Sequence, residues 1–192
     1  FTGTGTFITR TLYYLKQQMD EGKITYDDIL RKYMHELHAN EIVLLSYYIA
    51  AINIEAVFDE INGPDHGYKP FEGIVLTDTF ESTERQNTLD DDMFGENDKR
   101  LKKQQEVPIT AIISNPPYSV GQKNANDDNQ NVHYLKLEEQ IEKSYVKQSH
   151  SKLSMSVYDS YIKAFRWASD RIKNKRIIGF ITNNSFLDSN ST

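Results

Sequence analysis

The chain has 192 residues, of which 38% are hydrophobic and 26% charged, with a net charge of −6 and no cysteine. A chain of this length buries a core unaided, and the missing cysteine excludes disulfide scaffolds, zinc ribbons and thiol nucleophiles. The acidic balance argues against a free-standing nucleic-acid binder, because phosphate contacts need clustered lysine and arginine. The longest apolar stretch, residues 42–54, is interrupted by Ser46 and Asn53 and is too short to span a bilayer, which favours a cytoplasmic protein.

Apolar spacing predicts helices that alternate with short strands. In chain order the predicted elements are a helix over residues 7–19, a helix over 26–33, a strand over 34–38, a helix over 41–60, strands over 73–77 and 109–114, a helix over 157–168 and a strand over 177–182. Thr25 and Asn40 are expected to be N-caps of the second and third helices. This alternation indicates an α/β fold with a mostly parallel sheet flanked by helices.

Three further expectations concern burial and order. The helix over 41–60 is expected to bury a broad face made by Ile42, Leu45, Ile49, Ile52 and Ala56. The strands over 73–77, 109–114 and 177–182 are short apolar runs, typical of buried parallel strands. Residues 81–107 are charged with little apolar pattern, and residues 121–131, rich in Asn, Asp and Gln, are expected to form a mobile loop.

The most distinctive motif, Asn115-Pro116-Pro117-Tyr118, directly follows a predicted strand. In an open α/β sheet, ligands bind at the carboxyl ends of strands. Two prolines give a stiff turn that lacks two backbone donors, so the Asn115 side chain and the Pro116 carbonyl are suited to accept hydrogen bonds from an amine, with Tyr118 offering a face for stacking. Taken alone, the motif supports this interpretation and a purely structural turn equally.

Three other features lie where a cofactor would bind. The run Phe1-Thr2-Gly3-Thr4-Gly5 places two glycines before the first helix, where backbone can approach a ligand closely, although it lacks the third glycine of the dinucleotide fingerprint. Glu41 closely follows the predicted strand over 34–38, at the place of an acid for ribose hydroxyls, and Asp78 follows the strand over 73–77. Each feature also has a purely structural explanation. The glycine run could be a flexible terminus, Glu41 could be an acidic residue in the first turn of a helix, and Asp78 could cap a turn.

Other chemistries lack their parts. The histidines show no metal-ligand spacing with carboxylates, so no metal is expected; they are His35, His38, His66, His133 and His150. No nucleophile elbow or P-loop lysine is present, which disfavours hydrolysis and phosphoryl transfer.

Taken in order, the glycine run, Glu41, Asp78 and the Asn-Pro-Pro-Tyr turn resemble motifs I, II, III and IV of S-adenosylmethionine-dependent amino-methyltransferases, especially the DNA adenine-N6 group. The sequence around them, such as Phe-Thr-Gly-Thr-Gly-Thr-Phe-Ile-Thr-Arg, is similar to the methyltransferase region of single-chain, type I-like restriction-modification enzymes. These enzymes join a nuclease, a helicase-translocase, an adenine methyltransferase and a target-recognition domain. The similarity covers most of the chain and implies a Rossmann-like methyltransferase fold.

The resemblance also implies a role for each motif residue. S-adenosylmethionine would be held at its methionine end by Phe1, Thr2, Gly3, Thr4 and Gly5, at its ribose by Glu41, and at its adenine by Ile42 and Asp78, with Phe80 a weaker candidate. An adenine flipped out of duplex DNA would be received by Asn115, Pro116, Pro117 and Tyr118. The reaction would be in-line methyl transfer to a neutral nitrogen, governed by positioning rather than by a strong base.

The chain also departs from the family pattern. The strand before motif I and the cofactor-clamping motif are missing, and the chain stops soon after Asn183-Asn184-Ser185-Phe186, where motif VI would lie. We therefore interpret the chain as a partial methyltransferase domain, truncated at both ends, whose partners are duplex DNA and the helicase, nuclease and target-recognition domains of a larger polypeptide. The alternatives are a methyltransferase for protein glutamine or RNA, or a catalytically idle assembly domain.

Overall fold

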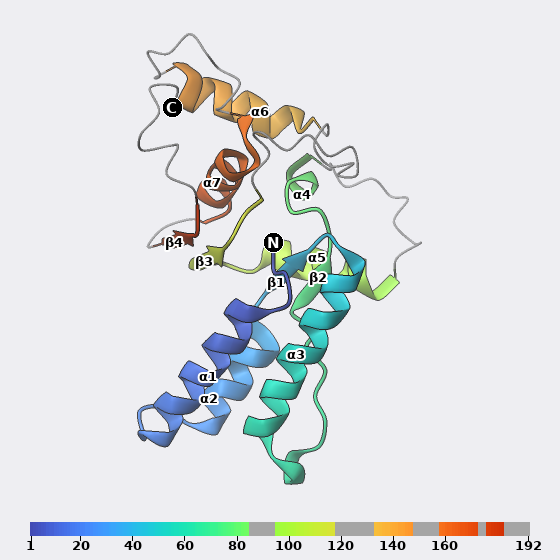
Figure 1. The fold of residues 1–192 in the computed structure, drawn as a ribbon, viewed down its shortest axis with the longest axis vertical. Helices are drawn as coiled ribbons and strands as arrows, with labels where there is room; N and C mark the ends of the chain where they lie inside the picture. The colour runs from blue at the N-terminus through green and yellow to red at the C-terminus, as the bar shows by residue number, and fades with distance from the viewer. Residues whose placement is uncertain (85–94, 118–132, 148–157, 173–175, 183–192) are drawn as a thin grey trace. The chain divides into compact units, whose positions relative to one another are not determined.

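The computed structural model describes residues 1–84, 95–117, 133–147, 158–172 and 176–182 (Figure 1). The chain divides into two compact units. Unit 1 comprises Phe1–Thr79 and Thr88–Val107, and unit 2 comprises Phe80–Asn87 and Pro108–Thr192. In the described ranges, no helix combines the length and the apolar character that crossing a membrane requires.

Unit 1 is a helical layer attached to a small parallel sheet. Its elements are α1 (Thr6–Asp20), α2 (Tyr26–Arg31), a π-helical turn (Lys32–Glu36), β1 (Ala39–Glu41), α3 (Leu44–Asn62), a 3₁₀ turn (Pro64–His66), β2 (Ile74–Leu76) and α5 (Gly95–Glu106). Figure 1 shows α1 and α2 in blue beside α3 in teal, and these three helices enclose the core. At its centre the ring of Tyr33 stacks on that of Phe58, with centroids 3.6 Å apart.

The local signals at the first two helices are confirmed. The helix expected over residues 7–19 is α1, and Thr25 is the N-cap of α2 with a reciprocal bond to Asp28. The strand expected over 34–38 is wrong, because the chain continues helically through Lys32–Glu36 and the strand begins only at Ala39. Apolar residues at this point serve the helical core, since Tyr33 is fully buried against α3. Asn40 consequently lies within β1 and does not cap α3.

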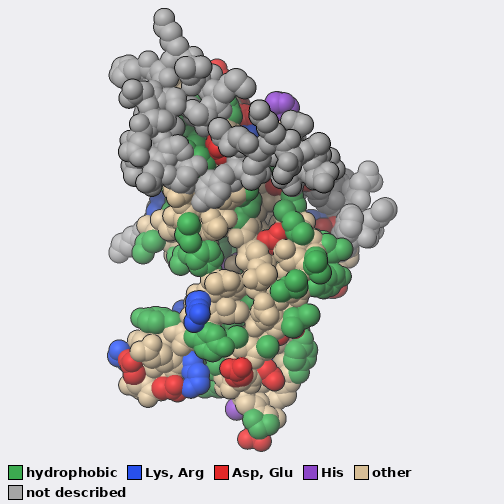
Figure 2. All heavy atoms as spheres, in the orientation of Figure 1, with side chains coloured by type: hydrophobic (Ala, Val, Ile, Leu, Met, Phe, Trp, Pro, Cys, Tyr) green, Lys and Arg blue, Asp and Glu red, His purple; other side chains and the backbone are tan. Residues whose placement is uncertain are grey.

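The burial expected for the third helix is also wrong. Its predicted inner face lies outside: Leu45 is 69% exposed and Ile52 is 65% exposed, and Ile42, Ile49 and Ala56 are exposed as well. The buried face instead consists of Ala50, Ile54, Val57, Phe58 and Ile61. Because α3 is apolar almost all round, its periodicity could not identify the inner face. The exposed apolar side chains contribute to the green surface over α3 in Figure 2.

Unit 2 contains a second parallel strand pair with helices. Its described elements are α4 (Glu81–Glu84), β3 (Ala111–Ser114), α6 (Leu135–Ile141), a π-helical turn (Glu142–Val146), α7 (Ser160–Arg171) and β4 (Ile177–Phe180). The strands β3 and β4 pair in parallel, and Phe165 of α7 packs against Phe180 of β4 with ring centroids 5.0 Å apart. The strands over 109–114 and 177–182, and the described part of the helix over 157–168, are thus confirmed.

One expectation for the second half of the chain fails, and the structure adds a helix where the sequence predicted no element. The strands β3 and β4 are not fully buried, since Ile113 is 56% and Ile177 is 70% exposed. Burial alternates along both strands, so the described part of unit 2 covers one of their faces more than the other. The charged segment over 81–107 contains the helix α5, whose single aliphatic residue, Leu101, left no periodic signal. The loop expected over 121–131 lies outside the described residues.

A charged pair inside unit 2 gives a testable pH dependence. Burial alone raises the pKa of Glu138, but the hydrogen bond and charge of Lys163, whose Nζ lies 2.7 Å from Oε1, outweigh it, so this pKa lies below its usual value. Its stabilising contribution is therefore complete above the unfolded pKa of glutamate, about 4.3, and is lost as pH falls through the lower folded value. We expect Glu138→Gln to lower the free energy of unfolding by about 1–2 kcal/mol at pH 7 and to flatten its decline in acid, measured by urea unfolding.

The neighbouring Glu139 provides the control for this prediction. It forms a fully exposed pair with Lys143 on the same helix, so Glu139→Gln should leave both the stability at pH 7 and its acid dependence almost unchanged. Equal effects of the two substitutions would contradict the role of the Glu138–Lys163 pair.

Candidate functional site

The glycine run before α1 forms a tight turn with a left-handed backbone. Gly3 has φ 58° and Gly5 has φ 87°, a region that other residues adopt only with strain. The N–H of Gly5 donates to the Thr2 carbonyl at 3.1 Å and closes the turn. Within the described residues no side chain caps the start of α1, which leaves its first N–H groups suited to an anionic or polar ligand.

This turn is attached to the carboxyl end of β1. The N–H of Thr2 and its hydroxyl donate to the Asn40 carbonyl at 3.1 and 2.8 Å. The N–H of Gly3 donates to Oε2 of Glu41 at 2.8 Å. Two of the sequence motifs, far apart in the chain, are therefore joined by direct hydrogen bonds.

Glu41 organises this junction from a buried position. Only 5% of the residue is exposed, and it is the last residue of β1, whereas the sequence placed it after the strand. Its Oε1 accepts the N–H groups of Ile42 at 3.0 Å and Val43 at 2.9 Å, in addition to the Gly3 bond on Oε2. A carboxylate offers about four acceptor positions, so one acceptor position remains for a hydroxyl of a ligand.

The helix α3 supports the turn from behind. A Cβ added to Gly5 would lie 3.1 Å from Cγ1 of Ile54 and 3.3 Å from the backbone of Ala50. From the same helix, the side-chain amide of Asn53 donates to the Thr4 carbonyl at 2.9 Å. A side chain at Gly5 would therefore be strained by its positive φ and would have to displace Ile54 or the backbone of α3 slightly.

We expect Gly5→Ala to lower the free energy of unfolding by about 2–3 kcal/mol, because it adds both left-handed strain and a close contact with α3. Gly22 is the matched control: its φ is 72°, but a Cβ there would meet nothing within 4 Å. Gly22→Ala should therefore cost only the strain, about 1 kcal/mol. Urea unfolding of both variants measures the difference, and equal losses would show that the contact with α3 is unimportant.

Asp78 lies at the same edge of the sheet. In the β1–β2 register Glu41 is opposite Leu76, and the N–H of Thr77 donates to the Glu41 carbonyl at 2.9 Å. The structure therefore brings the candidate cofactor residues of unit 1, from Phe1 to Gly5 with Glu41, Ile42 and Asp78, to one edge.

One buried polar atom at this edge has no partner within the described part of the chain, the side-chain oxygen of Asn40. A buried acceptor without a donor is costly, and such groups mark places where a ligand or water supplies the missing bond. The orphaned oxygen, the glycine turn and the remaining acceptor position on Glu41 together fit a nucleoside-type cofactor carrying hydroxyl and amine donors.

The candidate amine site belongs to unit 2. Asn115 and Pro117 are exposed directly after β3, while Pro116 is fully buried and anchors the turn between them. The N–H of Ile181 donates to the Ser114 carbonyl at 3.0 Å, so β4 supports the strand end that carries Asn115. Tyr118 lies outside the described residues.

Phe80, the weaker cofactor candidate, is packed within unit 2. It belongs to unit 2, where it is 4% exposed and its ring packs edge-on against Tyr134 with centroids 5.2 Å apart. In this position Phe80 is a core residue of unit 2.

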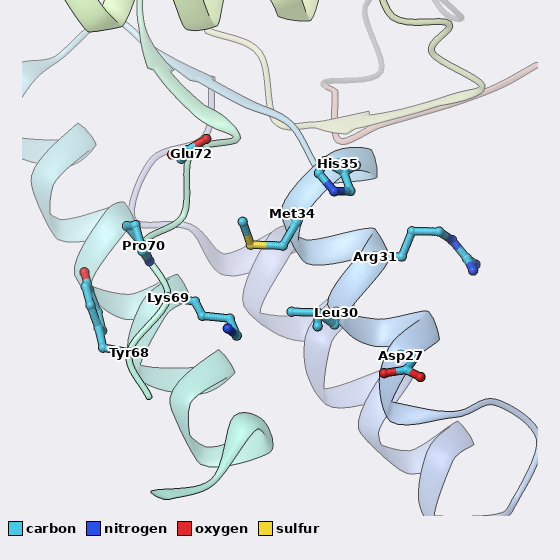
Figure 3. Close-up of a pocket in the computed structure, with 9 residues that line it drawn as sticks. All are labelled: Asp27, Leu30, Arg31, Met34, His35, Tyr68, Lys69, Pro70 and Glu72. Carbon is cyan, nitrogen blue, oxygen red and sulfur yellow. The ribbon is translucent and has the colours of Figure 1, made fainter. Parts of the chain in front are cut away.

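A hollow of about 450 Å³ lies elsewhere in unit 1, between α2 and the segment before β2 (Figure 3). It is lined by Asp27, Leu30, Arg31, Met34, His35, Tyr68, Lys69, Pro70 and Glu72, and includes none of the candidate site residues. Its charges are mixed, and Arg31 is already paired with Asp28 and Glu36.

Among the described residues there is also no group of three or more metal-ligating side chains.

Sequence reasoning missed three asparagines that surround the candidate cofactor residues. Asn53 holds the Thr4 carbonyl, Asn40 presents an orphaned oxygen, and Asn97 bonds to both backbone groups of Leu76. Asn53 is a polar residue within an apolar helix, and this exception in the sequence could have indicated a side chain with a specific hydrogen-bond partner. Nothing in the charged segment around Asn97 distinguished it from its neighbours.

Comparison with known proteins places this geometry in a family. Residues 6–192 match the family model of the Eco57I restriction-modification methylase, while the search of curated proteins gives no match. The whole chain is similar to a nuclease-deletion mutant of the Type ISP restriction-modification enzyme LlaGI in complex with a DNA substrate mimic (67% identity, TM-score 0.94). It is also similar to the ATP-dependent Type ISP enzyme LlaBIII bound to DNA (64% identity, TM-score 0.93).

A third similar structure is the DrdV–DNA complex, with 39% identity, a TM-score of 0.83 and 99% of this chain covered. The chain spans only 16%, 13% and 17% of the LlaGI, LlaBIII and DrdV chains, respectively. These matches confirm the α/β fold class and the resemblance drawn from the four motifs. By its match over residues 6–192, the chain belongs to the Eco57I restriction-modification methylase family.

Proposed function

We propose that this chain transfers a methyl group from S-adenosylmethionine to the N6 amine of a flipped adenine in DNA, as the modification part of a restriction-modification system. The observation that carries the proposal is the network around Glu41, which joins the glycine turn to β1 through the Gly3 N–H and places one buried carboxylate beside it. Membership of a restriction-modification methylase family supports methyl transfer as the reaction.

The residues of unit 1 would hold the cofactor. The turn from Phe1 to Gly5 would bind its methionine end through backbone groups, because the glycines allow close approach and the start of α1 is uncapped. Glu41 would accept a ribose hydroxyl, the exposed side chain of Ile42 would cover one face of the adenine, and Asp78 would accept its amine. When bound, S-adenosylmethionine supplies a methyl group activated by a sulfonium.

The residues of unit 2 would position the target amine. The Asn115 side-chain oxygen and the Pro116 carbonyl would each accept one N–H of the amine, which draws the nitrogen lone pair away from conjugation with the purine ring and toward the methyl donor. Pro117 would stiffen the turn, and Tyr118 would stack on the base. As the new N–C bond forms and the S–CH3 bond breaks, the sulfonium would become the neutral thioether of S-adenosylhomocysteine and the nitrogen would become positive. The oxygen acceptors would stabilise that charge until one proton leaves to solvent.

The partners follow from the same proposal. The similar LlaGI, LlaBIII and DrdV structures are each complexes with DNA or a DNA mimic. We infer that this chain likewise acts on duplex DNA, within a polypeptide that also carries helicase, nuclease and target-recognition domains. The acidic net charge of −6 is consistent with DNA being held mainly by such other domains.

Two measurements on the full-length protein test this function. Calorimetric titration with S-adenosylmethionine should show saturable one-site binding and thermal stabilisation. A radiolabelled methyl transfer assay should then label duplex DNA, and digestion should place the label on adenine N6. Label on RNA or on a glutamine-containing peptide instead would replace the DNA assignment, and absence of cofactor binding would leave an idle assembly domain.

A further inference from the structure

The side chain of Asn97 completes the open edge of β2. Its Oδ1 accepts the N–H of Leu76 at 2.9 Å, and its Nδ2 donates to the carbonyl of the same residue at 3.0 Å. One amide therefore satisfies both backbone groups of one strand residue, as a neighbouring strand would. Asn97 lies in the first turn of α5, and a sequence separation of 21 residues makes this a tertiary contact.

The strand geometry explains why this residue of β2 needs a partner. The carbonyl of Gly73 and the N–H of Thr77 bond to β1, so the intervening even-numbered positions direct their backbone groups to the opposite edge. Within the described residues β2 is an edge strand, paired only with β1. Unpaired N–H and C=O groups at such an edge can pair with another chain and cost free energy if they are buried. The Asn97 amide satisfies both groups at Leu76, the last residue of the strand.

The helix α5 is itself anchored next to this contact. One turn further along, the Arg100 guanidinium donates to the Tyr47 hydroxyl of α3 at 3.2 Å. The contact of Asn97 with β2 and that of Arg100 with α3 fix the first turns of α5 at two points. The amide of Asn97 is thereby held in the plane where it can serve both groups of Leu76.

We propose that Asn97 is a positioning residue for the adenine end of the cofactor, acting through Leu76 on Asp78. This inference rests on the proposed function, because it takes Asp78 as the acceptor of the adenine amine. Asp78 follows the clamped Leu76 by two residues, and between them Thr77 bonds to β1. The strand end is therefore fixed from both sides just before the carboxylate, which sets where Asp78 meets the amine.

The test compares two amide deletions on the same helix in the full-length protein. Asn97→Ala removes the clamp, whereas Gln105→Ala removes an exposed amide of α5. We expect Asn97→Ala to weaken binding of S-adenosylhomocysteine by about tenfold, the effect of one lost hydrogen bond, with kcat at saturating cofactor within about twofold of the wild type. Gln105→Ala should change neither quantity.

A second ligand separates positioning from general destabilisation. The purine-riboside analogue of S-adenosylhomocysteine carries a hydrogen in place of the adenine amine, so it gives Asp78 no N–H to accept. Asn97→Ala should leave its affinity unchanged and thus reduce the preference for the adenine ligand by about tenfold. Asn97→Asp keeps the acceptor for the Leu76 N–H but opposes the Leu76 carbonyl with a negative charge, and should resemble Asn97→Ala.

The outcomes distinguish this inference from the proposed function. If the wild-type protein binds neither ligand, the proposed function fails first. If the wild type binds and prefers the adenine ligand, and Asn97→Ala binds both ligands as tightly as the wild type, the positioning role is wrong. Equal weakening of both ligands by Asn97→Ala, accompanied by a lower Tm, would overturn it in favour of a structural role alone.

Discussion

Asn115→Ala is expected to lower the single-turnover rate of methyl transfer to DNA by about 100- to 1,000-fold, the typical effect of removing one preorganised polar contact from a reacting centre. In the proposed function, the Asn115 oxygen is one of two acceptors that orient the target amine. Asn115 is exposed on a turn anchored by the buried Pro116, so the substitution should leave the fold and the cofactor affinity unchanged. Radiolabelled transfer with enzyme in excess over DNA measures the rate.

Two further variants make this result specific. Asn115→Asp keeps an oxygen that can accept the amine N–H, so it should retain more activity than Asn115→Ala. Gln140→Ala removes an exposed amide from α6 of the same unit and should transfer methyl groups at the wild-type rate. If Asn115→Ala transferred methyl groups at the wild-type rate, Asn115 would have no role in orienting the target amine.

The local elements of the fold could be predicted from sequence where a short signal determines them. Thr25 with Asp28 forms a capping box, and the apolar runs ending at Leu76, Ser114 and Phe180 are short parallel strands. Prediction failed where neighbours in space decide the structure. The sequence predicts a strand over residues 34–38, of which only Met34 and Leu37 are apolar, yet packing of the adjacent Tyr33 on Phe58 continues the helix instead.

The candidate site shows the same division. Motif order identified the glycine turn, Glu41, Asp78 and Asn115, and the structure brings those in unit 1 to one sheet edge. The supporting amides could not be found in this way. Asn97 lies in a helix with a single aliphatic residue, and its function depends on an edge-strand residue 21 positions away, a relation that no local pattern encodes.

Glu41→Gln is expected to weaken cofactor binding by at least about 100-fold and to lower the free energy of unfolding by about 1–3 kcal/mol. All three N–H groups around this side chain are donors, one to Oε2 and two to Oε1. A glutamine must direct its NH2 either at Gly3 or at the Ile42 and Val43 pair, so a donor meets a donor in a buried place. The loss should release the glycine turn from β1 as well as remove the acceptor for the ribose.

Glu55 provides the matched control for this last prediction. It is a partly buried glutamate of α3 that accepts the Phe71 N–H at 2.9 Å and the Tyr68 hydroxyl at 2.8 Å, away from the glycine turn. Glu55→Gln should cost less stability in urea unfolding, because a glutamine there can accept the Phe71 N–H and donate its NH2 to the Tyr68 hydroxyl, and it should leave the calorimetric Kd for S-adenosylmethionine unchanged. Both variants exchange a carboxylate of unit 1 for an amide, but only Glu41 contacts the glycine turn. Equal loss of cofactor affinity in the two variants would mean that Glu41 acts through stability alone, and undiminished affinity in Glu41→Gln would exclude it from the cofactor site.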